Sequence, residues 1–355
     1  MAKNIRVAVC GTGHMGEGII KLLLEKEGID LVGIHGKRPA NQGKDVADVI
    51  GLDKKTGVKV ETDLNKMLKD AKADIVIQAT HSKVKGDNLG AGAYNDMKTI
   101  LNSGCNLISI AEEAAFPWVG SPVETADLDK ICKSKKLTML GTGINPGFVL
   151  DLLVIALTGV CYKVDHIKAT RINDLSPYGY NVMKTQGVNL PEAEFIKGVK
   201  DGTVEGHFGF KESINMIARS LNWEIGKIEE TKAPIVSKVE RDGGEAGKII
   251  PGNTAGCDHR AKAYDKNGKL LIELVHPQQV RPEAEGNGTQ DIIEIFGYPD
   301  IKISTGPEIP GGKGTIALAV NMIPQVLNNT NFGVVTMADL PVPHCLLGDV
   351  RKLLK

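Results

Sequence analysis

Short hydrophobic runs alternate with segments of helical periodicity through the first part of the chain. Continuous apolar runs predict strands at residues 5–10, 31–34, 75–79, 106–110 and 137–140. Between them, the spacing of apolar residues predicts helices at residues 16–27, 64–69, 95–103 and 125–133. Strands of continuous Val, Ile and Leu that are separated by helices are typical of a parallel sheet covered on both faces. We therefore expect a doubly wound α/β domain over residues 1–147.

The pattern changes after Gly147. Residues 148–157 predict a helix that links two domains, and alternating polar and apolar positions predict strands at residues 166–172, 261–264 and 270–275. These features indicate a second, α+β domain over residues 148–312. Residues 315–327 return to a helical pattern, so we expect the segment 313–355 to pack back on the first domain.

Composition and charge narrow the function classes. The chain has 355 residues, enough for two domains, and its 42% hydrophobic and 24% charged residues are typical of a globular protein. Lys plus Arg and Asp plus Glu both number 43, and this balance argues against nucleic acid or an anionic membrane as a partner. Neither Cys257-Asp258-His259 nor His344-Cys345 has the spacing of a metal site. The chain lacks a bilayer-spanning run, a signal-peptide core and any Cys-x-x-Cys pair, so we expect a cytoplasmic protein without a metal.

A glycine-rich turn follows the first predicted strand and opens the first predicted helix. It reads Gly11-Thr12-Gly13-His14-Met15-Gly16. In this pattern the first glycine permits a tight turn, the second lets the backbone approach a pyrophosphate, and the third allows close packing of helix against strand. The diphosphate would lie at a helix N-terminus, where free N–H groups favour anions. The alternative is a glycine-rich turn without a ligand, but the β/α alternations that follow favour a Rossmann-type dinucleotide site.

The choice of cofactor depends on the residues that follow the second predicted strand. An enzyme that uses NAD usually places an acidic residue there to bind the ribose hydroxyls. This chain has Lys37 and Arg38 instead, and two cations can pair with the 2′-phosphate of NADP. We therefore expect NADP or NAD as the cofactor, with NADP favoured. The alternative is that both side chains are simply solvated.

With these residues placed, the chain resembles the dihydrodipicolinate reductase-like oxidoreductases, and more closely the 2,4-diaminopentanoate dehydrogenases and the related native amine dehydrogenases. The resemblance covers essentially the whole chain. Besides residues 11–16, it rests on residues 110–118, 141–147, 170–174, 206–210 and 275–277. The Lys-x-Asp-Ala-Pro-Ser-Gly-Thr type of segment of true dihydrodipicolinate reductases is missing, which argues against the lysine-pathway reaction.

The resemblance implies NAD(P)-dependent oxidative deamination of 2,4-diaminopentanoate to 2-amino-4-oxopentanoate and ammonia. This step of ornithine degradation can run in reverse as reductive amination. The resemblance also implies that Glu112 is the catalytic carboxylate and that Asn145 hydrogen-bonds the amine or the carbonyl group. Glu112 follows a predicted parallel strand, at the edge where open α/β sheets bind ligands. The alternative is that Glu112 and its neighbour Glu113 cap or solvate the following helix.

The resemblance further implies a set of substrate-binding residues: Arg171, Asn173, His207, His276 and Thr315. Arg171 offers a planar two-pronged donor for the α-carboxylate, and the histidines offer donors whose charge depends on pH. From the residues alone each has a plain alternative, such as a solvated strand residue for Arg171 or a helix-start residue for Thr315. Thr80 and His81 follow a predicted strand and are expected to line the nicotinamide side of the cofactor.

Two other function classes stay open on the sequence. A reductase of a cyclic imine or an aldehyde would need no ammonia in the reductive direction, whereas an amine dehydrogenase would. A redox-sensing NAD(P)-binding regulator would show no turnover. The resemblance also implies a homodimer built through the open face of the second domain's sheet. The expected partner is therefore a small-molecule diamino acid, with no nucleic acid and no membrane.

Overall fold

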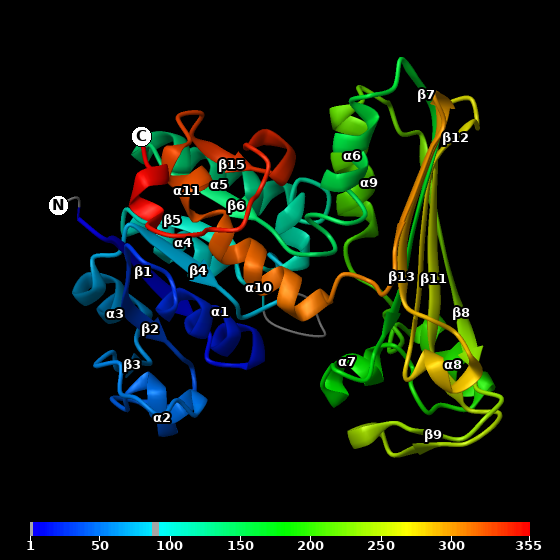
Figure 1. Ribbon diagram of the computed structural model, residues 1–355, viewed down its shortest axis with the longest axis horizontal. Helices are drawn as coiled ribbons and strands as arrows, with labels where there is room; N and C mark the ends of the chain where they lie inside the picture. Colours follow the sequence, from blue (N-terminus) through cyan, green and yellow to red (C-terminus); the bar gives the residue numbers. More distant parts are fainter. Residues whose placement is uncertain (1–2, 87–91) are drawn as a thin grey trace. The chain divides into compact units, whose positions relative to one another are not determined.

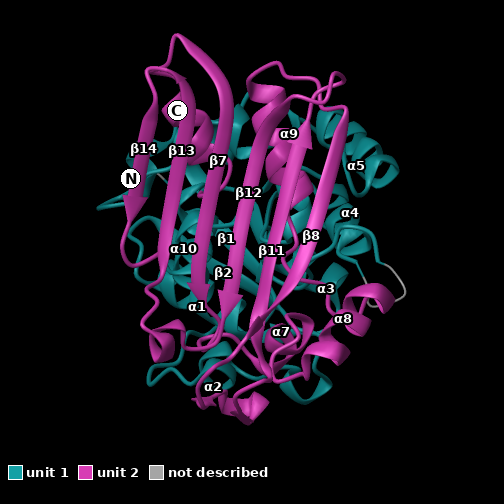
Figure 2. Ribbon diagram, turned by 90° about the vertical axis from the view of Figure 1, so that its right-hand side faces the viewer, with its two compact units in different colours: residues 1–148, 310–355 teal, residues 149–309 magenta. Residues whose placement is uncertain are grey.

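The computed structural model describes residues 3–86 and 92–355, and the chain forms two compact units. Unit 1 comprises residues 1–148 and 310–355, and unit 2 comprises residues 149–309 (Figures 1 and 2). The C-terminal segment therefore belongs to the first unit. Within the described ranges, no helix is long and apolar enough to cross a membrane.

Unit 1 is built on a seven-stranded parallel sheet with the strand order β15-β6-β5-β4-β1-β2-β3. Its strands are β1 (Ile5–Cys10), β2 (Ile29–His35), β3 (Val60–Glu61), β4 (Ile75–Gln78), β5 (Asn106–Ser109), β6 (Thr138–Gly141) and β15 (Gly333–Val335). Every residue of β4 and β6 is buried, which explains why these strands read as continuous apolar runs. The structure confirms the predicted doubly wound α/β fold.

Helices connect the strands of unit 1. They are α1 (His14–Leu24), α2 (Val46–Ile50), α3 (Leu64–Ala71), α4 (Tyr94–Asn102), α5 (Pro122–Lys135), α10 (Gly311–Asn321) and α11 (Ile323–Asn328). Met67 of α3, Ile100 of α4 and Leu128 of α5 share one buried core with sheet residues. Helix α1 packs against α10 so closely that a Cβ atom at Gly18 would lie 2.2 Å from Ile316 Cδ1. Helix α10 of the C-terminal segment thus covers α1, the helix that follows the glycine-rich turn.

Two predicted helices differ from the structure. The pattern at 315–327 predicted one helix, but the structure divides it into α10 and α11, because Pro324 lies in the first turn of α11 and cannot donate a backbone hydrogen bond. The predicted helix at 148–157 is α6 (Leu152–Thr158), which begins later than expected. Asp151 sets this start, because its side chain accepts a hydrogen bond from the Leu152 amide.

Unit 2 is built on a six-stranded mixed sheet with the strand order β14-β13-β7-β12-β11-β8, seen face-on in Figure 2. Its strands are β7 (Lys163–Asp174), β8 (Lys227–Val236), β11 (Thr254–Tyr264), β12 (Leu270–Gln279), β13 (Gln290–Tyr298) and β14 (Ile301–Thr305), with a small separate pair β9 (Arg241–Asp242) and β10 (Lys248–Ile249). Only β7 and β12 pair in parallel, and the other neighbours are antiparallel. The predicted strands of this region exist, and each is longer than its sequence pattern indicated.

The two faces of the unit 2 sheet differ. Its helices are α6, α7 (Tyr180–Thr185), α8 (Glu192–Asp201) and α9 (Phe210–Ser220), and α6 and α9 run along one face (Figure 1). Phe210 of α9 contacts the ring of His259 on β11, so His259 faces these helices. Because side chains alternate along a strand, Asp258 and Arg260 face the other side, which no helix of residues 149–309 covers.

Candidate functional site

The glycine-rich turn adopts the geometry that a phosphate loop requires. Gly11 has a φ of +118°, and a Cβ atom there would lie 2.4 Å from the Ala79 carbonyl oxygen. A Cβ atom at Gly16 would lie 2.1 Å from the Gly11 carbonyl oxygen, whereas one at Gly13 would meet nothing within 4 Å. Gly13 is also the N-cap of α1 and gives the helix no side-chain cap. The open backbone and the uncapped helix end fit the diphosphate of a dinucleotide.

The other residues of this turn lie around the same helix start. Thr12 lies beside Gly36, since a Cβ atom at Gly36 would come within 3.3 Å of the Thr12 side chain. His14 and Met15 are the first two residues of α1, and His14 is exposed. The predicted cofactor residues of β1 and β2 therefore lie at one edge of the sheet.

Lys37 and Arg38, both exposed, differ in their surroundings. The Nζ atom of Lys37 lies 3.0 Å from Asp96 Oδ2 on α4 and 3.5 Å from the Nε2 atom of His81. By contrast, the described residues give the side chain of Arg38 no hydrogen bond and no ion pair. Of these two cations, Arg38 is therefore the one whose charge no described residue shares.

His81 lies beside Lys37 at the same edge of the sheet. The sequence predicted Lys37 at the adenosine ribose and His81 on the nicotinamide side. In the sheet, β1 separates β2 from β4 by one strand, so a lysine after β2 can reach the loop after β4. Burial lowers the pKa of His81, and the charge of Lys37 lowers it further. His81 is therefore neutral near pH 7 beside this cation.

Two buried polar atoms without described partners lie at the end of β4 and in the loop that follows it. The Nε2 atom of Gln78 and the Oγ1 atom of Thr80 are buried and have no hydrogen-bond partner among the described residues. Leaving such an atom unpaired costs on the order of 1–3 kcal/mol, so native proteins rarely do it without a ligand or water to complete the bond. Both atoms fit polar groups of a cofactor bound at this edge.

Glu112 and Glu113 have different environments within one short 3-10 helix, Glu112–Ala115, which follows β5. Glu113 accepts hydrogen bonds from the Val84 amide at 2.5 Å and from Ser121 Oγ at 2.8 Å, so it holds two segments together. Burial raises the pKa of the Glu112 carboxyl, and a hydrogen bond with Ser82 lowers it in part. Glu113 is thus tied to its neighbours, and Glu112 stays the predicted catalytic carboxylate.

Thr315 of α10 contacts the loop after β6 that carries Asn145. The Ile144 amide donates a hydrogen bond to Thr315 Oγ1 at 3.0 Å, which fixes this loop to α10. Both polar atoms of the Asn145 carboxamide are buried without a partner among the described residues. Thr315 thus supports the loop that carries Asn145, a role that the sequence did not predict.

Two of the predicted residues of unit 2, Arg171 and His276, lie on one polar row across its sheet. Asp291 on β13 pairs in register with Arg171 on β7, and His276 on β12 pairs with His259 on β11. The Nδ1 atom of His276 lies 2.7 Å from the Arg171 carbonyl oxygen, which links the two halves of the row. The ring of His207 lies 4.7 Å from that of His276.

The structure gives Arg171 partners that the sequence did not show. Its Nη1 atom donates to Asp291 Oδ1 at 2.7 Å, and its Nη2 atom donates to the Ile309 carbonyl at 2.6 Å. The side chains of Arg171 and Asp291 are only 2% and 4% exposed. Arg171 is therefore not a solvated strand residue, and its guanidinium group is already shared with a buried carboxylate.

The two predicted imidazoles are neutral. Burial lowers the pKa of His276 to about 3, with the charge of Arg171 as a further cause. Burial also lowers the pKa of His207 well below its usual range, and His276 adds to this shift. Their charge therefore does not vary over ordinary working pH, contrary to the expectation from the residue type. The Nε2 atom of His207 and the Oδ1 atom of Asn173 are buried and have no partner among the described residues.

Three residues that contact predicted ones were missed, namely Asp96, Asp291 and His259, each from a distant part of the chain. Glu230, which contacts His259, was missed as well. Strand alternation was the available signal for His259, since it places His259 and Cys257 on the buried side and Asp258 on the other. In residues 3–86 and 92–355, no group of three or more His, Cys, Asp or Glu side chains could hold a metal ion.

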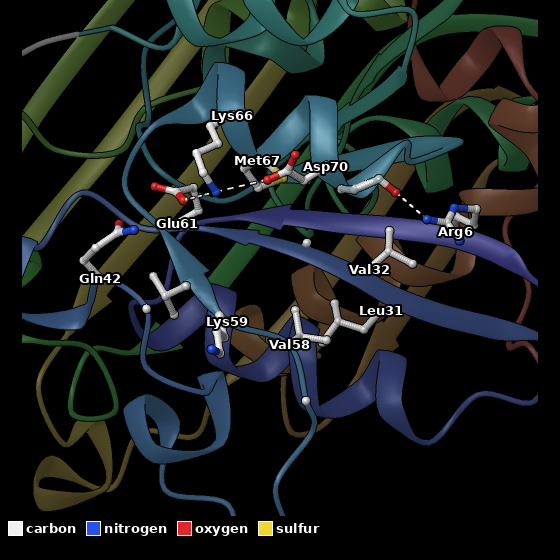
Figure 3. Close-up of a pocket in the computed structure, with 15 residues that line it drawn as sticks. Arg6, Leu31, Val32, Gln42, Val58, Lys59, Glu61, Lys66, Met67 and Asp70 are labelled. Carbon is white, nitrogen blue, oxygen red and sulfur yellow. Dashed lines mark hydrogen bonds and ion pairs between the residues drawn. The ribbon is translucent and has the colours of Figure 1, made fainter.

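A cavity of about 570 Å³ in unit 1 lies outside these residues (Figure 3). Lys66 on its wall lies 2.8 Å from Glu61 Oε2 and 3.0 Å from Asp70 Oδ2. Arg6 donates to the carbonyl groups of Ala71 and Lys72 at 2.6 and 3.0 Å. Both cations are therefore paired within the wall, and the cavity shares no residue with the phosphate loop.

Known proteins are similar to this chain over nearly its whole length. Residues 148–355 match the family described as 2,4-diaminopentanoate dehydrogenase C-terminal domain, and residues 5–104 match the N-terminus of dihydrodipicolinate reductase. The chain is similar to a 2,4-diaminopentanoate dehydrogenase of Acetoanaerobium sticklandii, with 40% identity over 99% of this chain and 98% of that protein. It is 25% identical to an amine dehydrogenase of Streptomyces virginiae over 84% of both chains.

A solved structure agrees as well. The amine dehydrogenase from Mycobacterium smegmatis has a TM-score of 0.83 and 25% identity to this chain, and covers 96% of this chain and 97% of its own. The predicted resemblance is confirmed by the match of residues 148–355 and by 40% identity across nearly the whole length. The chain belongs to the 2,4-diaminopentanoate dehydrogenase family.

Proposed function

We propose that this protein is an NAD(P)-dependent amine dehydrogenase that removes the C4 amine of 2,4-diaminopentanoate by oxidative deamination. Family membership supports the reaction class. The observation that carries the proposal is the desolvated carboxyl of Glu112, which follows β5 at the carboxyl edge of the sheet that also carries the phosphate loop. This edge is where open α/β sheets bind ligands.

The reaction turns the C4 amine and water into a C4 ketone and ammonia, with loss of a hydride. When bound, oxidised NAD(P) accepts that hydride from C4. Glu112 takes a proton from the substrate ammonium, so that the nitrogen lone pair can form the C=N bond. Once that proton has passed to solvent, the carboxylate stabilises the positive iminium and takes a proton from the water that attacks C4, and this proton returns to the nitrogen as ammonia leaves. Asn145, with two unpaired buried polar atoms, hydrogen-bonds the nitrogen or the new oxygen.

The polar row of unit 2 suits the amino-acid end of the substrate. A carbonyl oxygen only accepts hydrogen bonds, so the neutral ring of His276 carries its proton on Nδ1 and presents Nε2 as an acceptor. Such an acceptor suits the α-ammonium group. Arg171 has five N–H groups and uses two toward Asp291 and Ile309, which leaves donors for the α-carboxylate. Asn173 and His207 add polar atoms without partners among the described residues.

A preference for NADP over NAD is the finer part of the proposal. Arg38, free of described partners and exposed, supports it because a guanidinium pairs well with a phosphate. Lys37 supports it less, because Asp96 already shares its charge. We also propose that Thr80 and Gln78 hydrogen-bond the cofactor through their unpaired atoms.

The assembly and setting are proposals from the family resemblance. The face of the unit 2 sheet that has no helix of its own is the surface on which we propose that two copies form a homodimer. It carries exposed Phe296 beside ion pairs such as Lys302 with Glu294. A role in ornithine degradation in the cytoplasm accords with the six free cysteines.

The proposal is tested by an initial-rate assay of cofactor reduction. Purified protein is given NADP or NAD with 2,4-diaminopentanoate, short alkyl amines and lysine-pathway intermediates. We expect reduction with 2,4-diaminopentanoate and release of one ammonia per reduced cofactor. Oxidation of NADPH by a cyclic imine in a parallel assay with reduced cofactor, with no turnover of 2,4-diaminopentanoate, would contradict the proposal in favour of the reductase alternative.

A further inference from the structure

A buried histidine that the sequence did not select joins two segments of unit 2. His259 is 1% exposed and lies on β11. The Nδ1 atom of its ring lies 3.0 Å from the backbone nitrogen of His207, and its Nε2 atom lies 3.2 Å from Glu230 Oε2. The ring therefore bridges a carboxylate on β8 and the backbone of a proposed substrate residue.

These two contacts fix the tautomer of His259. A backbone N–H can only donate, so the Nδ1 atom that receives it carries no proton. The proton of the neutral ring is then on Nε2, where it is donated to the Glu230 carboxylate. The carboxylate thus selects the ring form that can accept from His207. A ring with the opposite tautomer would place an N–H against the His207 amide.

The neighbouring sequence is shaped around this ring. Gly206 has a φ of +69°, and a Cβ atom there would lie 2.8 Å from His259 Nδ1. A side chain at position 206 would therefore push the ring away from the His207 amide. Phe210 packs against both rings, at 5.0 Å from His207 and 4.8 Å from His259. His259 thus holds the backbone of His207, and Phe210 packs against its ring.

The ring of His207 has a nitrogen atom whose hydrogen-bonding capacity is not used by the described residues. Its Nε2 atom is buried without a partner in the part of the chain that the structure describes. Its ring lies 4.7 Å from the ring of His276 in an edge-to-face arrangement. A buried ring nitrogen without a protein partner indicates that a ligand atom completes its hydrogen bond. How well the nitrogen binds that atom depends on how firmly the ring is held.

We propose that Glu230 is a positioning residue that acts through His259 to hold His207 in place for the amino-acid end of the substrate. The proposal rests on the proposed function for the identity of that ligand. Glu230 itself touches neither substrate nor cofactor. Its second contact, with Lys211 Nζ at 3.5 Å, gives a way to disturb Glu230 without disturbing His259.

The chain offers matched variants. Glu230→Leu removes the carboxylate, and His259→Phe keeps the ring volume but removes the acceptor. His259→Asn is the conservative rescue, because the Asn oxygen lies near the position of Nδ1 and can accept from the His207 amide. Lys211→Met removes only the other partner of Glu230. Glu229→Gln, on the same strand but on the opposite face, is the general control.

The first readout is affinity without turnover. The dissociation constant of 2,4-diaminopentanoate is measured by calorimetry with protein saturated with NADPH, a pair that cannot react because both are reduced. We expect it to rise roughly tenfold in Glu230→Leu and His259→Phe, the size of one lost hydrogen bond to a charged group. His259→Asn, Lys211→Met and Glu229→Gln should stay near the wild-type value, and the affinity for NADPH should be unchanged in all five.

The second readout needs no substrate. The His207 amide proton should exchange with solvent about tenfold faster in Glu230→Leu and His259→Phe, but not in His259→Asn. Equal exchange in all variants would overturn the proposed link between Glu230 and His207. Faster exchange with unchanged affinity for 2,4-diaminopentanoate would overturn its role in recognition, as would a wild type that does not bind this ligand. If the protein binds 2,4-diaminopentanoate but does not turn it over, the proposed function is contradicted. Both readouts then still test the role of Glu230.

Discussion

The ammonium group of Lys37 lies 3.0 Å from the Asp96 carboxylate, although the two residues follow different strands of the sheet and lie far apart in the sequence. Lys37 lies two residues after the end of β2, and Asp96 lies in the first turn of α4, the helix after β4. Lysine and carboxylate therefore meet at the carboxyl edge where a dinucleotide binds. Lys37 therefore shares its charge with Asp96, whereas Arg38, the other predicted phosphate cation, has no partner among the described residues.

Asp96→Asn should increase the preference for NADP. The change releases Lys37 and removes a negative charge that would repel a 2′-phosphate. Because the pair is partly exposed, we expect only a two- to fivefold tighter binding of NADP, roughly the value of an exposed ion pair. Fluorescence titration with both cofactors checks this. A parallel change for NADP and NAD would show that Asp96 does not act near that phosphate.

Arg38→Ala should weaken NADP binding far more than Lys37→Ala does. Loss of one hydrogen bond to a charged group corresponds to about 1.5–3 kcal/mol, so we expect a tenfold or larger rise in the dissociation constant for NADP. NAD, which lacks the 2′-phosphate, should be affected little by either change. If both variants bind NADP as wild type does, neither side chain contacts the phosphate.

Glu112→Gln should lower turnover by roughly a hundredfold or more with retained cofactor affinity, because it removes the base and the negative charge at similar size. In wild type the specificity constant for the amine should rise with pH as Glu112 loses its proton, above the usual range of a carboxyl because burial raises its pKa. This rising limb of the pH–rate profile should be missing in Glu112→Gln. A pH–rate profile that keeps this limb would assign the base elsewhere.

The same pair of acids gives a stability prediction. A carboxyl whose pKa is raised in the folded state stabilises the fold while protonated, and this contribution is lost as pH rises through the folded pKa. At neutral pH, Glu112→Gln should therefore melt at the same or a higher temperature than wild type. Glu113→Gln should melt lower, because Glu113 accepts from the Val84 amide and Ser121. Calorimetric melting of both variants at pH 7 compares them, and a lower melting temperature for Glu112→Gln would contradict this assignment.

Arg171 must be tested together with Asp291. Arg171→Met alone leaves a buried carboxylate without its cation and should cost about 3–5 kcal/mol of stability. Arg171→Met with Asp291→Asn removes both charges, keeps an acceptor for the Ile309 amide, and should recover most of that loss. In this double variant, the ratio of specificity constants for 2,4-diaminopentanoate and a short alkyl amine should fall. A ratio equal to that of wild type would remove Arg171 from carboxylate binding.

Local patterns predicted the first unit well, because its information is local. Continuous apolar strands, the glycines at 11, 13 and 16, and an acid after β5 are each visible in a short stretch of sequence. The roles of the three glycines follow from backbone geometry, and the φ of Gly11 and the packing at Gly16 agree with them. Glu112 and Glu113 could not be told apart on sequence, because their difference comes from Ser121 and Val84.

The second unit was harder because its chemistry depends on strand register. Arg171 and Asp291 are 120 residues apart, and Glu230 and His259 are 29 apart, so only the pairing of strands brings them together. Strands β8, β13 and β14 carry many polar residues, and their alternation was not recognised. Without the register, the sequence showed no carboxylate partner for Arg171. It showed His259 only beside Cys257 and Asp258, in a group without the spacing of a metal site.

The most direct test of the central claim is the ammonium dependence of the reverse reaction. The protein is given 2-amino-4-oxopentanoate and NADPH, and oxidation of NADPH is followed as ammonium is raised from zero at fixed pH, with a potassium salt holding ionic strength constant. An amine dehydrogenase incorporates the nitrogen into the product, so we predict no oxidation without ammonium, a saturable rise with it, and one 2,4-diaminopentanoate formed per NADPH consumed. Oxidation of NADPH at the same rate without ammonium, with an alcohol as the product, would contradict the assignment of this chain as an amine dehydrogenase.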